Sequence, residues 1–179
     1  MTGFRNHRRT PKALSLVLTF SFFLLLLPAT LHASSNTNYL NINAGYIGLL
    51  NNAANALRYG LEYRHKALSR WLIRPALGGF IGEHDATYLY AGIRRDFTIG
   101  ERWLLAPSLD IGSYRPGNGI DLGTELEFRS GVELGYRFDT WRVSFGLFHL
   151  SNGGIGDRNP GTNSAVIAMH IPLNGNGVE

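Results

Sequence analysis

The chain has 179 residues, no cysteine, and 17 basic against 13 acidic side chains, which gives a formal charge of +4. The absence of cysteine excludes a disulfide-stabilised scaffold. A basic excess can indicate a nucleic-acid or anionic partner. However, four of the basic residues lie in Met1–Ala33, where no acid occurs, and Ser34–Glu179 then carries thirteen of each sign. The charge therefore gives no support for a polyanionic partner.

Residues Met1–Ala33 have the parts of a secretory signal peptide. A basic start precedes an apolar run from Ala13 to Leu27, and Ala33 is a small residue where cleavage can occur. The apolar run has about 15 residues, fewer than the roughly 20 of a membrane-spanning helix. The next residues, 34–38, are polar and uncharged, so no stop-transfer cluster follows. We predict a cleaved signal peptide over 1–33 and a single mature domain over 34–179.

Turn signals divide the mature chain into eight segments with the period-2 pattern of β-strands. No run after Leu27 approaches the length of a membrane helix. Short turns alternate with connections that are on the whole longer and richer in Gly, Pro and Asn, which is the plan of an up-and-down outer-membrane barrel. The predicted strands are 38–48, 55–65, 71–81, 86–98, 102–114, 123–138, 141–151 and 163–173.

The sixth predicted strand shows the alternation most clearly. Leu126 and Phe128 lie on an apolar face, whereas Glu127 and Arg129 lie on a face of charged residues and glycines. The second and fifth strands repeat the pattern. Two structures fit it: a soluble lipocalin-like barrel with the apolar face inside, and a membrane barrel with the apolar face outside.

Three features favour the membrane barrel. Positive and negative side chains are balanced on the polar face, so they can pair inside a narrow eight-stranded barrel. Lysine, the usual cation of soluble surfaces, occurs once after the signal, at Lys66. Aromatic residues gather near strand ends, as an interfacial girdle requires. We therefore predict an all-β fold: an eight-stranded antiparallel up-and-down transmembrane β-barrel in the outer membrane of a Gram-negative cell. The polar-face charges are Arg58, Arg64, Arg74, Arg94, Arg129, Arg137 and Arg142, with Glu62, Asp96, Asp110, Glu125, Glu127 and Glu133.

The seventh predicted strand carries a notable polar pair at its loop end. His149 and Ser151 continue the apolar row of Phe145 and Leu147, so both are expected to point outward, near the membrane surface. Their i, i+2 spacing places the two Cβ atoms about 7 Å apart. A histidine beside a serine hydroxyl is the minimum for a base-activated nucleophile. The alternative is that both are interfacial polar residues at a strand end.

The residues that follow favour catalysis. Asn152, Gly153 and Gly154 supply a side-chain amide and flexible backbone N–H groups that can stabilise an oxyanion. An outward polar pair against lipid is also costly without a function.

Two motifs here, FHLSNGG at 148–154 and NPG at 159–161, resemble the signature of the outer-membrane lipid A 3-O-deacylases, the PagL family. The resemblance is specific over Phe145–Leu173 and covers the rest of the mature chain only in strand number, length and alternation. It implies an eight-stranded barrel with an active site facing the outer leaflet. The implied substrate is the lipid A of lipopolysaccharide, and the implied reaction is hydrolysis of the ester at its 3-position.

The resemblance also implies roles for individual residues. The family's histidine and serine correspond to His149 and Ser151, and its oxyanion asparagine corresponds to Asn152. The family's glutamate, which orients the histidine, falls at Asn163 when counted without gaps. An amide oxygen can accept the imidazole N–H but adds no negative charge. The alternatives are that Asp157 serves as the acid or that the enzyme is inactive.

No metal or cofactor is expected. The four histidines of the mature chain are scattered and cysteine is absent, and no helix follows the glycine-rich stretches, as a phosphate loop would require. Two competing functions stay open: a non-enzymatic outer-membrane barrel for adhesion or membrane integrity, and a soluble secreted lipid-binding barrel. The adhesive barrel is disfavoured because the longest predicted loop, 152–162, is short.

Overall fold

The computed structural model describes residues 36–49, 55–68 and 72–173. The predicted signal peptide and the polar end of the chain lie outside these residues, as do parts of the first predicted long loop and of the first short turn. The signal peptide and the boundary at residue 34 therefore stay predictions. Within the described ranges, no helix is long and apolar enough to cross a membrane.

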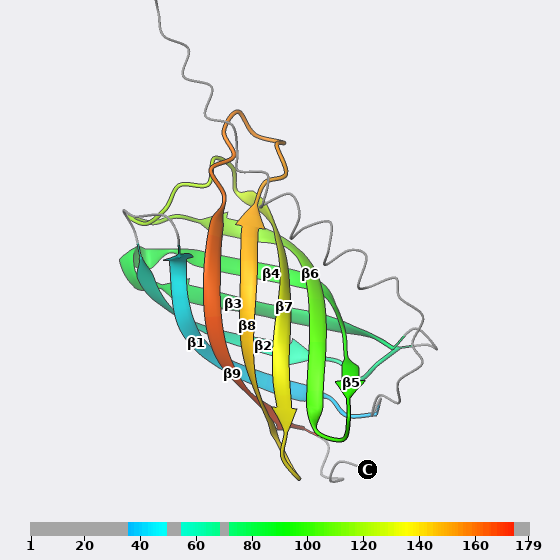
Figure 1. Cartoon of the computed structure of the whole chain (residues 1–179). Coiled ribbons are helices and arrows are strands. Elements are labelled where there is room, and N and C mark those ends of the chain that lie inside the picture. The colour runs from blue at the N-terminus through cyan, green and yellow to red at the C-terminus, as the bar shows by residue number, and fades with distance from the viewer. Residues whose placement is uncertain (1–35, 50–54, 69–71, 174–179) are drawn as a thin grey trace, which may run out of the picture.

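The described strands form a closed antiparallel barrel (Figure 1). Successive strands pair with each other, and β1 pairs with β9 to join the two ends of the chain. Because β4 and β5 both pair with β6, they share one strand position, and the barrel has the eight predicted positions. The strands are β1 (Tyr39–Leu49), β2 (Ala56–Arg64), β3 (Ile73–Gly82), β4 (Thr87–Arg95), β5 (Phe97–Ile99), β6 (Trp103–Arg115), β7 (Leu126–Arg137), β8 (Arg142–Ser151) and β9 (Thr162–Pro172), with a short 3-10 turn at Glu83–Asp85.

The fourth predicted strand is interrupted at Asp96, which separates β4 from β5. Its pairing with β6 stops at Arg94 and resumes at Phe97. The gap lies beside Pro107 of β6, and proline has no N–H to donate to the ladder. Asp96 is buried and accepts a hydrogen bond of 2.7 Å from Arg142 inside the barrel. An interior ion pair thus replaces local sheet pairing at this position.

The strands alternate as in a membrane barrel, with apolar side chains on the outer face and charged side chains on the inner face. On β2, Tyr59 and Leu61 are 54% and 56% exposed on the outer face, whereas Arg58 and Glu62 on the inner face are 1% and 3% exposed. A soluble barrel with an apolar interior and a charged surface is therefore excluded, and the prediction of an outward apolar face is confirmed.

Most of the charges predicted for the polar face pair inside the barrel. Glu62 accepts hydrogen bonds from Arg64, from Arg94 at 2.6 Å and from Arg129 at 3.5 Å. Asp110 accepts from the same Arg94 and Arg129, at 2.5 and 2.7 Å. Shared arginines thus connect Glu62 and Asp110, and Arg64 extends this network to Glu133. Asp96 pairs with other arginines, and buried Glu127 has no ion pair among the described residues.

Two charges predicted for the interior lie elsewhere. Arg137 donates to the carbonyl oxygen of Glu101 near the short-turn end, and Glu125 is exposed beside Ser113 and Arg115. Both residues stand at or beyond an end of β7, where the alternation continues in sequence but the barrel no longer encloses the side chain.

Each end of the barrel has its own apolar structure. At the short-turn end, Trp103, Tyr136, Phe138 and Trp141 form a chain of ring contacts with centroids 4.2 to 5.1 Å apart, which fits the predicted interfacial girdle. At the loop end, a buried cluster fills the interior and holds the inner side of β8 through Leu150. That cluster comprises Ile47, Ala56, Phe80, Ala86, Tyr88, Tyr90, Tyr114, Leu122 and Leu150.

Candidate active site

The predicted site lies where β8 ends and β9 begins. The loop 152–161 joins these neighbouring strands and rises above the barrel (Figure 1). In the register of the sheet, His149 lies between Ser130 of β7 and Asn163 of β9. The pairing of β8 with its two neighbours in sequence thus brings residues from β7 and β9 beside the predicted base.

His149 and Ser151 belong to the outward row of β8, but they are almost covered. Phe145 and Leu147 earlier in that row are 49% and 50% exposed, whereas His149 and Ser151 are 3% and 4% exposed. Both residues thus lie on the outward row, but their side chains are enclosed by protein. Neighbours across the sheet and the loop above enclose this end of the row, and Gly161 lies directly against the imidazole.

Asn163 is bound to His149, as the resemblance to the PagL family implied. The His149 Nδ1 and Asn163 Oδ1 atoms are 3.0 Å apart. Because an amide oxygen only accepts hydrogen bonds, Nδ1 carries the hydrogen, and the lone pair of Nε2 is left to take a proton. This arrangement orients the ring of the predicted base without supplying a negative charge.

The described structure contains no hydrogen bond between His149 and Ser151, which project from the same face two residues apart. Catalytic hydrogen bonds are often long in the absence of substrate, so this does not exclude the pair. Asp157, the alternative acid, is exposed in the loop, and the described contacts of His149 do not include it.

Asn152 holds the loop together. It is fully buried, and its Nδ2 donates to the carbonyl oxygens of Leu122 at 3.0 Å and Arg158 at 2.7 Å. Its Oδ1 accepts from the Gly154 N–H at 2.9 Å. The predicted oxyanion donors of Asn152 and Gly154 are thus engaged within the protein in this structure.

Gly153 differs from its two neighbours. It is exposed at the turn with a φ of +65°, a left-handed conformation that favours glycine. Among the described residues, its N–H donates to no other group. Of the three residues predicted for the oxyanion site, Gly153 has the N–H available to a ligand.

Ser130 is a neighbour that the sequence reasoning missed. It is fully buried on the outward row of β7, directly across from His149, and its hydroxyl has no hydrogen-bond partner among the described residues. Nothing in the local pattern of β7 indicates this position, because the sheet register alone brings the two residues together.

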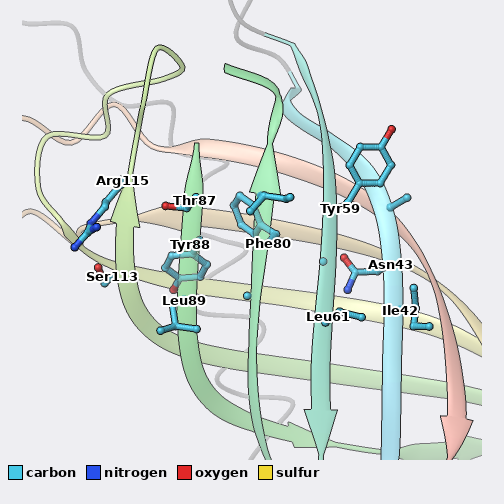
Figure 2. A pocket seen from close by; sticks show the side chains of 14 residues that line it. Ile42, Asn43, Tyr59, Leu61, Phe80, Thr87, Tyr88, Leu89, Ser113 and Arg115 are labelled. Atoms are coloured by element: carbon cyan, nitrogen blue, oxygen red, sulfur yellow. The ribbon is translucent and has the colours of Figure 1, made fainter. Parts of the chain in front are cut away.

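A hollow of the surface lies away from this site. It measures about 880 Å³ and lies over β1–β4 and β6 (Figure 2). Gly79 faces outward there between Leu61 and Leu89 of the neighbouring strands. The hollow contains neither His149 nor Ser151 and has the apolar character of a lipid-facing surface.

No metal site is found in the described part of the chain, where no three His, Asp or Glu side chains gather to hold an ion. His170, on β9, points into the barrel as expected from its parity. Its Nε2 lies 2.8 Å from the hydroxyl of Ser144, within the interior polar network.

Comparison with known protein families places the chain, including the candidate site, in one family. Residues 57–172 match the family described as lipid A 3-O-deacylase (PagL). The chain belongs to this family. The matched segment includes β8, the loop and β9, so the predicted site lies within it. Membership makes the chain a lipid A deacylase in general terms, a hydrolase of the outer membrane. No curated protein matches the chain.

Solved structures agree on the fold. A crystal structure of the outer membrane enzyme PagL superposes with a TM-score of 0.62 at 18% identity, covering 75% of this chain and 99% of that one. A de novo designed transmembrane β-barrel has a TM-score of 0.57 at 8% identity, covering 78% and 97%. Neisserial surface protein A has 0.54 at 12% identity, covering 75% and 96%. At these low sequence identities, the structural similarity shows a shared barrel fold alone.

Proposed function

We propose that this PagL-family barrel is a serine esterase that hydrolyses the ester-linked acyl chain at the 3-position of lipid A in the outer leaflet. The observation that carries the proposal is the 3.0 Å contact between His149 Nδ1 and Asn163 Oδ1, with Ser151 two residues further on the same face. An oriented imidazole beside a hydroxyl supports nucleophilic catalysis.

The proposed reaction has two halves. Ser151 Oγ attacks the ester carbonyl while His149 Nε2 takes its proton, and the proton then passes to the departing sugar oxygen. The acyl group is left on Ser151. Water, deprotonated by His149, attacks this acyl-enzyme, and the proton returns to Ser151 as the fatty acid leaves. Asn163 keeps the imidazole in the tautomer that both halves need.

Oxyanion stabilisation is assigned mainly to the Gly153 N–H. This group is exposed and unpaired among the described residues, close in sequence to Ser151. Asn152 and the Gly154 N–H support it by shaping the turn through their mutual hydrogen bond. Removing one oxyanion donor typically costs about 10²–10³ in rate.

The experiment compares lipid A from cells expressing the wild type, Ser151→Ala and His149→Ala. We expect mass spectrometry to show loss of a 3-linked acyl chain with the wild type and retention of that chain with both variants. Ser113→Ala is the matched control, because Ser113 is an exposed outward serine at the loop end of β6, away from His149. That variant should deacylate like the wild type.

Heat-modifiable gel migration shows that each variant forms a barrel. Unchanged lipid A in wild-type cells would contradict the proposal, and so would continued deacylation by Ser151→Ala. Loss of an acyl chain from another position would leave an esterase but overturn the assignment to the 3-position.

A further inference from the structure

Gly161, the last residue of the loop before β9, lies against the imidazole of His149. A Cβ built on Gly161 would stand 2.9 Å from Cε1 and 3.3 Å from Nε2 of that ring. Real Cβ atoms essentially never approach another heavy atom closer than 3.0 Å. Gly161 also has a φ of +60°, so its backbone and its surroundings both favour glycine.

The contact lies on a different part of the ring from the hydrogen bond. Asn163 holds Nδ1, while Gly161 packs against the edge formed by Cε1 and Nε2. Both residues belong to one short segment around Thr162, where β9 begins. The hydrogen bond sets the tautomer, and the bare Cα of Gly161 sets how far the ring can lean toward the loop.

We infer that Gly161 is a positioning residue for His149, an inference that rests on the proposed function. A methyl group at this position pushes the ring away from the loop, which stretches the bond to Asn163 and moves Nε2 relative to Ser151. A displacement of catalytic groups by about 1 Å can lower the rate by about 10²-fold. We therefore expect a methyl group at position 161 to lower the rate strongly.

The test is Gly161→Ala against a control with the same backbone strain. Gly100 has a φ of +63° in the short turn at the other end of the barrel, and a Cβ there meets nothing within 4 Å. Gly100→Ala therefore reproduces the left-handed alanine without the contact. The readouts are kcat and KM for lipid A in detergent and the rate at which a fluorophosphonate labels Ser151.

We expect Gly161→Ala to lower kcat and the labelling rate by about 10²-fold, with KM nearly unchanged. Gly100→Ala should keep both rates near those of the wild type. If Gly161→Ala reacts as fast as Gly100→Ala, or if its loss lies in KM alone, the inference is wrong.

A double variant keeps the test decisive if Gly161→Ala unfolds. Removing the ring with His149→Ala takes away the group that the new methyl would strike, so Gly161→Ala/His149→Ala should recover the heat-modifiable barrel. A double variant as unstable as Gly161→Ala would overturn the inference. A wild type that neither labels nor deacylates would instead refute the proposed esterase, while this stability coupling would still report the contact.

Discussion

In this protein, the group that accepts a hydrogen bond from His149 is an amide. Asn163 accepts the Nδ1 hydrogen at 3.0 Å and thereby keeps the Nε2 lone pair available. An amide orients the ring as a carboxylate does, but it gives the imidazolium formed during the reaction no charge to interact with. In the proposed mechanism, Asn163 therefore orients the base but supplies no charge to the imidazolium.

Asn163→Asp tests this separation, because the two side chains have nearly the same shape. We expect the aspartate to keep the contact with Nδ1 and to raise the deacylation rate by about tenfold or more, since a negative charge then stabilises the imidazolium. Asn163→Ala should lower the rate because the tautomer is no longer held. The measurement is initial rates on lipid A in detergent, and equal rates for asparagine and aspartate would show that charge plays no part.

Two loops contact each other above the barrel. The loop between β6 and β7 meets the loop between β8 and β9 through the Asn152 bonds and through an exposed ion pair between Arg158 and Asp121. Asp121 also accepts the Gly123 N–H at 2.8 Å. These contacts join the segment that follows Ser151 to a loop about thirty residues earlier in the chain.

The pKa of Asp121 reports this contact. The Gly123 N–H first, and the Arg158 guanidinium second, hold the pKa of Asp121 below its ordinary value of 3.8. A lowered pKa in the folded state means that the carboxylate stabilises the loops above pH 3.8, and that this contribution is lost as the pH falls through the folded value. The loop contact is therefore expected to persist through neutral and mildly acidic conditions.

The pKa of Asp121 is measured by NMR titration of its carboxyl group in detergent micelles. Arg158→Ala should move the pKa only part of the way back toward 3.8, because the Gly123 N–H remains. Arg115→Ala removes another exposed arginine at this end of the barrel and should leave the Asp121 titration unchanged. An unaltered pKa in Arg158→Ala would contradict the ion pair.

Charged side chains of the barrel lie in two environments, the buried interior and the exposed short-turn end. The interior holds a network in which Glu62 meets Arg64, Arg94 and Arg129, all at most 5% exposed. Charges at the short-turn end, such as Arg102 and Asp139, pair at 3.3 Å in contact with water. Removing one partner of a buried network leaves uncompensated charges, whereas an exposed pair contributes little.

We expect Glu62→Gln to lower the free energy of unfolding by about 3 kcal/mol or more. The exposed counterpart Asp139→Asn should change it by less than about 0.5 kcal/mol. Both are measured by urea unfolding of the barrel in micelles, followed by tryptophan fluorescence. Similar effects from the two variants would argue against the interior network as a stabilising unit.

The sequence by itself determined the architecture and the identity of the central residues. Turn signals and period-2 alternation predicted the strand number. Balanced polar-face charges, scarce lysine and aromatic strand ends predicted that the apolar face points outward. The candidate site was predicted from the His149 and Ser151 pair and from the resemblance of its motif to the PagL family, which implied Asn163 as the third member.

Only the tertiary structure decided what surrounds those residues. The burial of His149, the opposition of Ser130, the contact of Gly161 and the engagement of Asn152 depend on sheet register and loop conformation. The break at Asp96 likewise depends on a proline in the neighbouring strand and an arginine three strand positions away. Local periodicity encodes only which way a side chain points, whereas these features arise when distant segments meet.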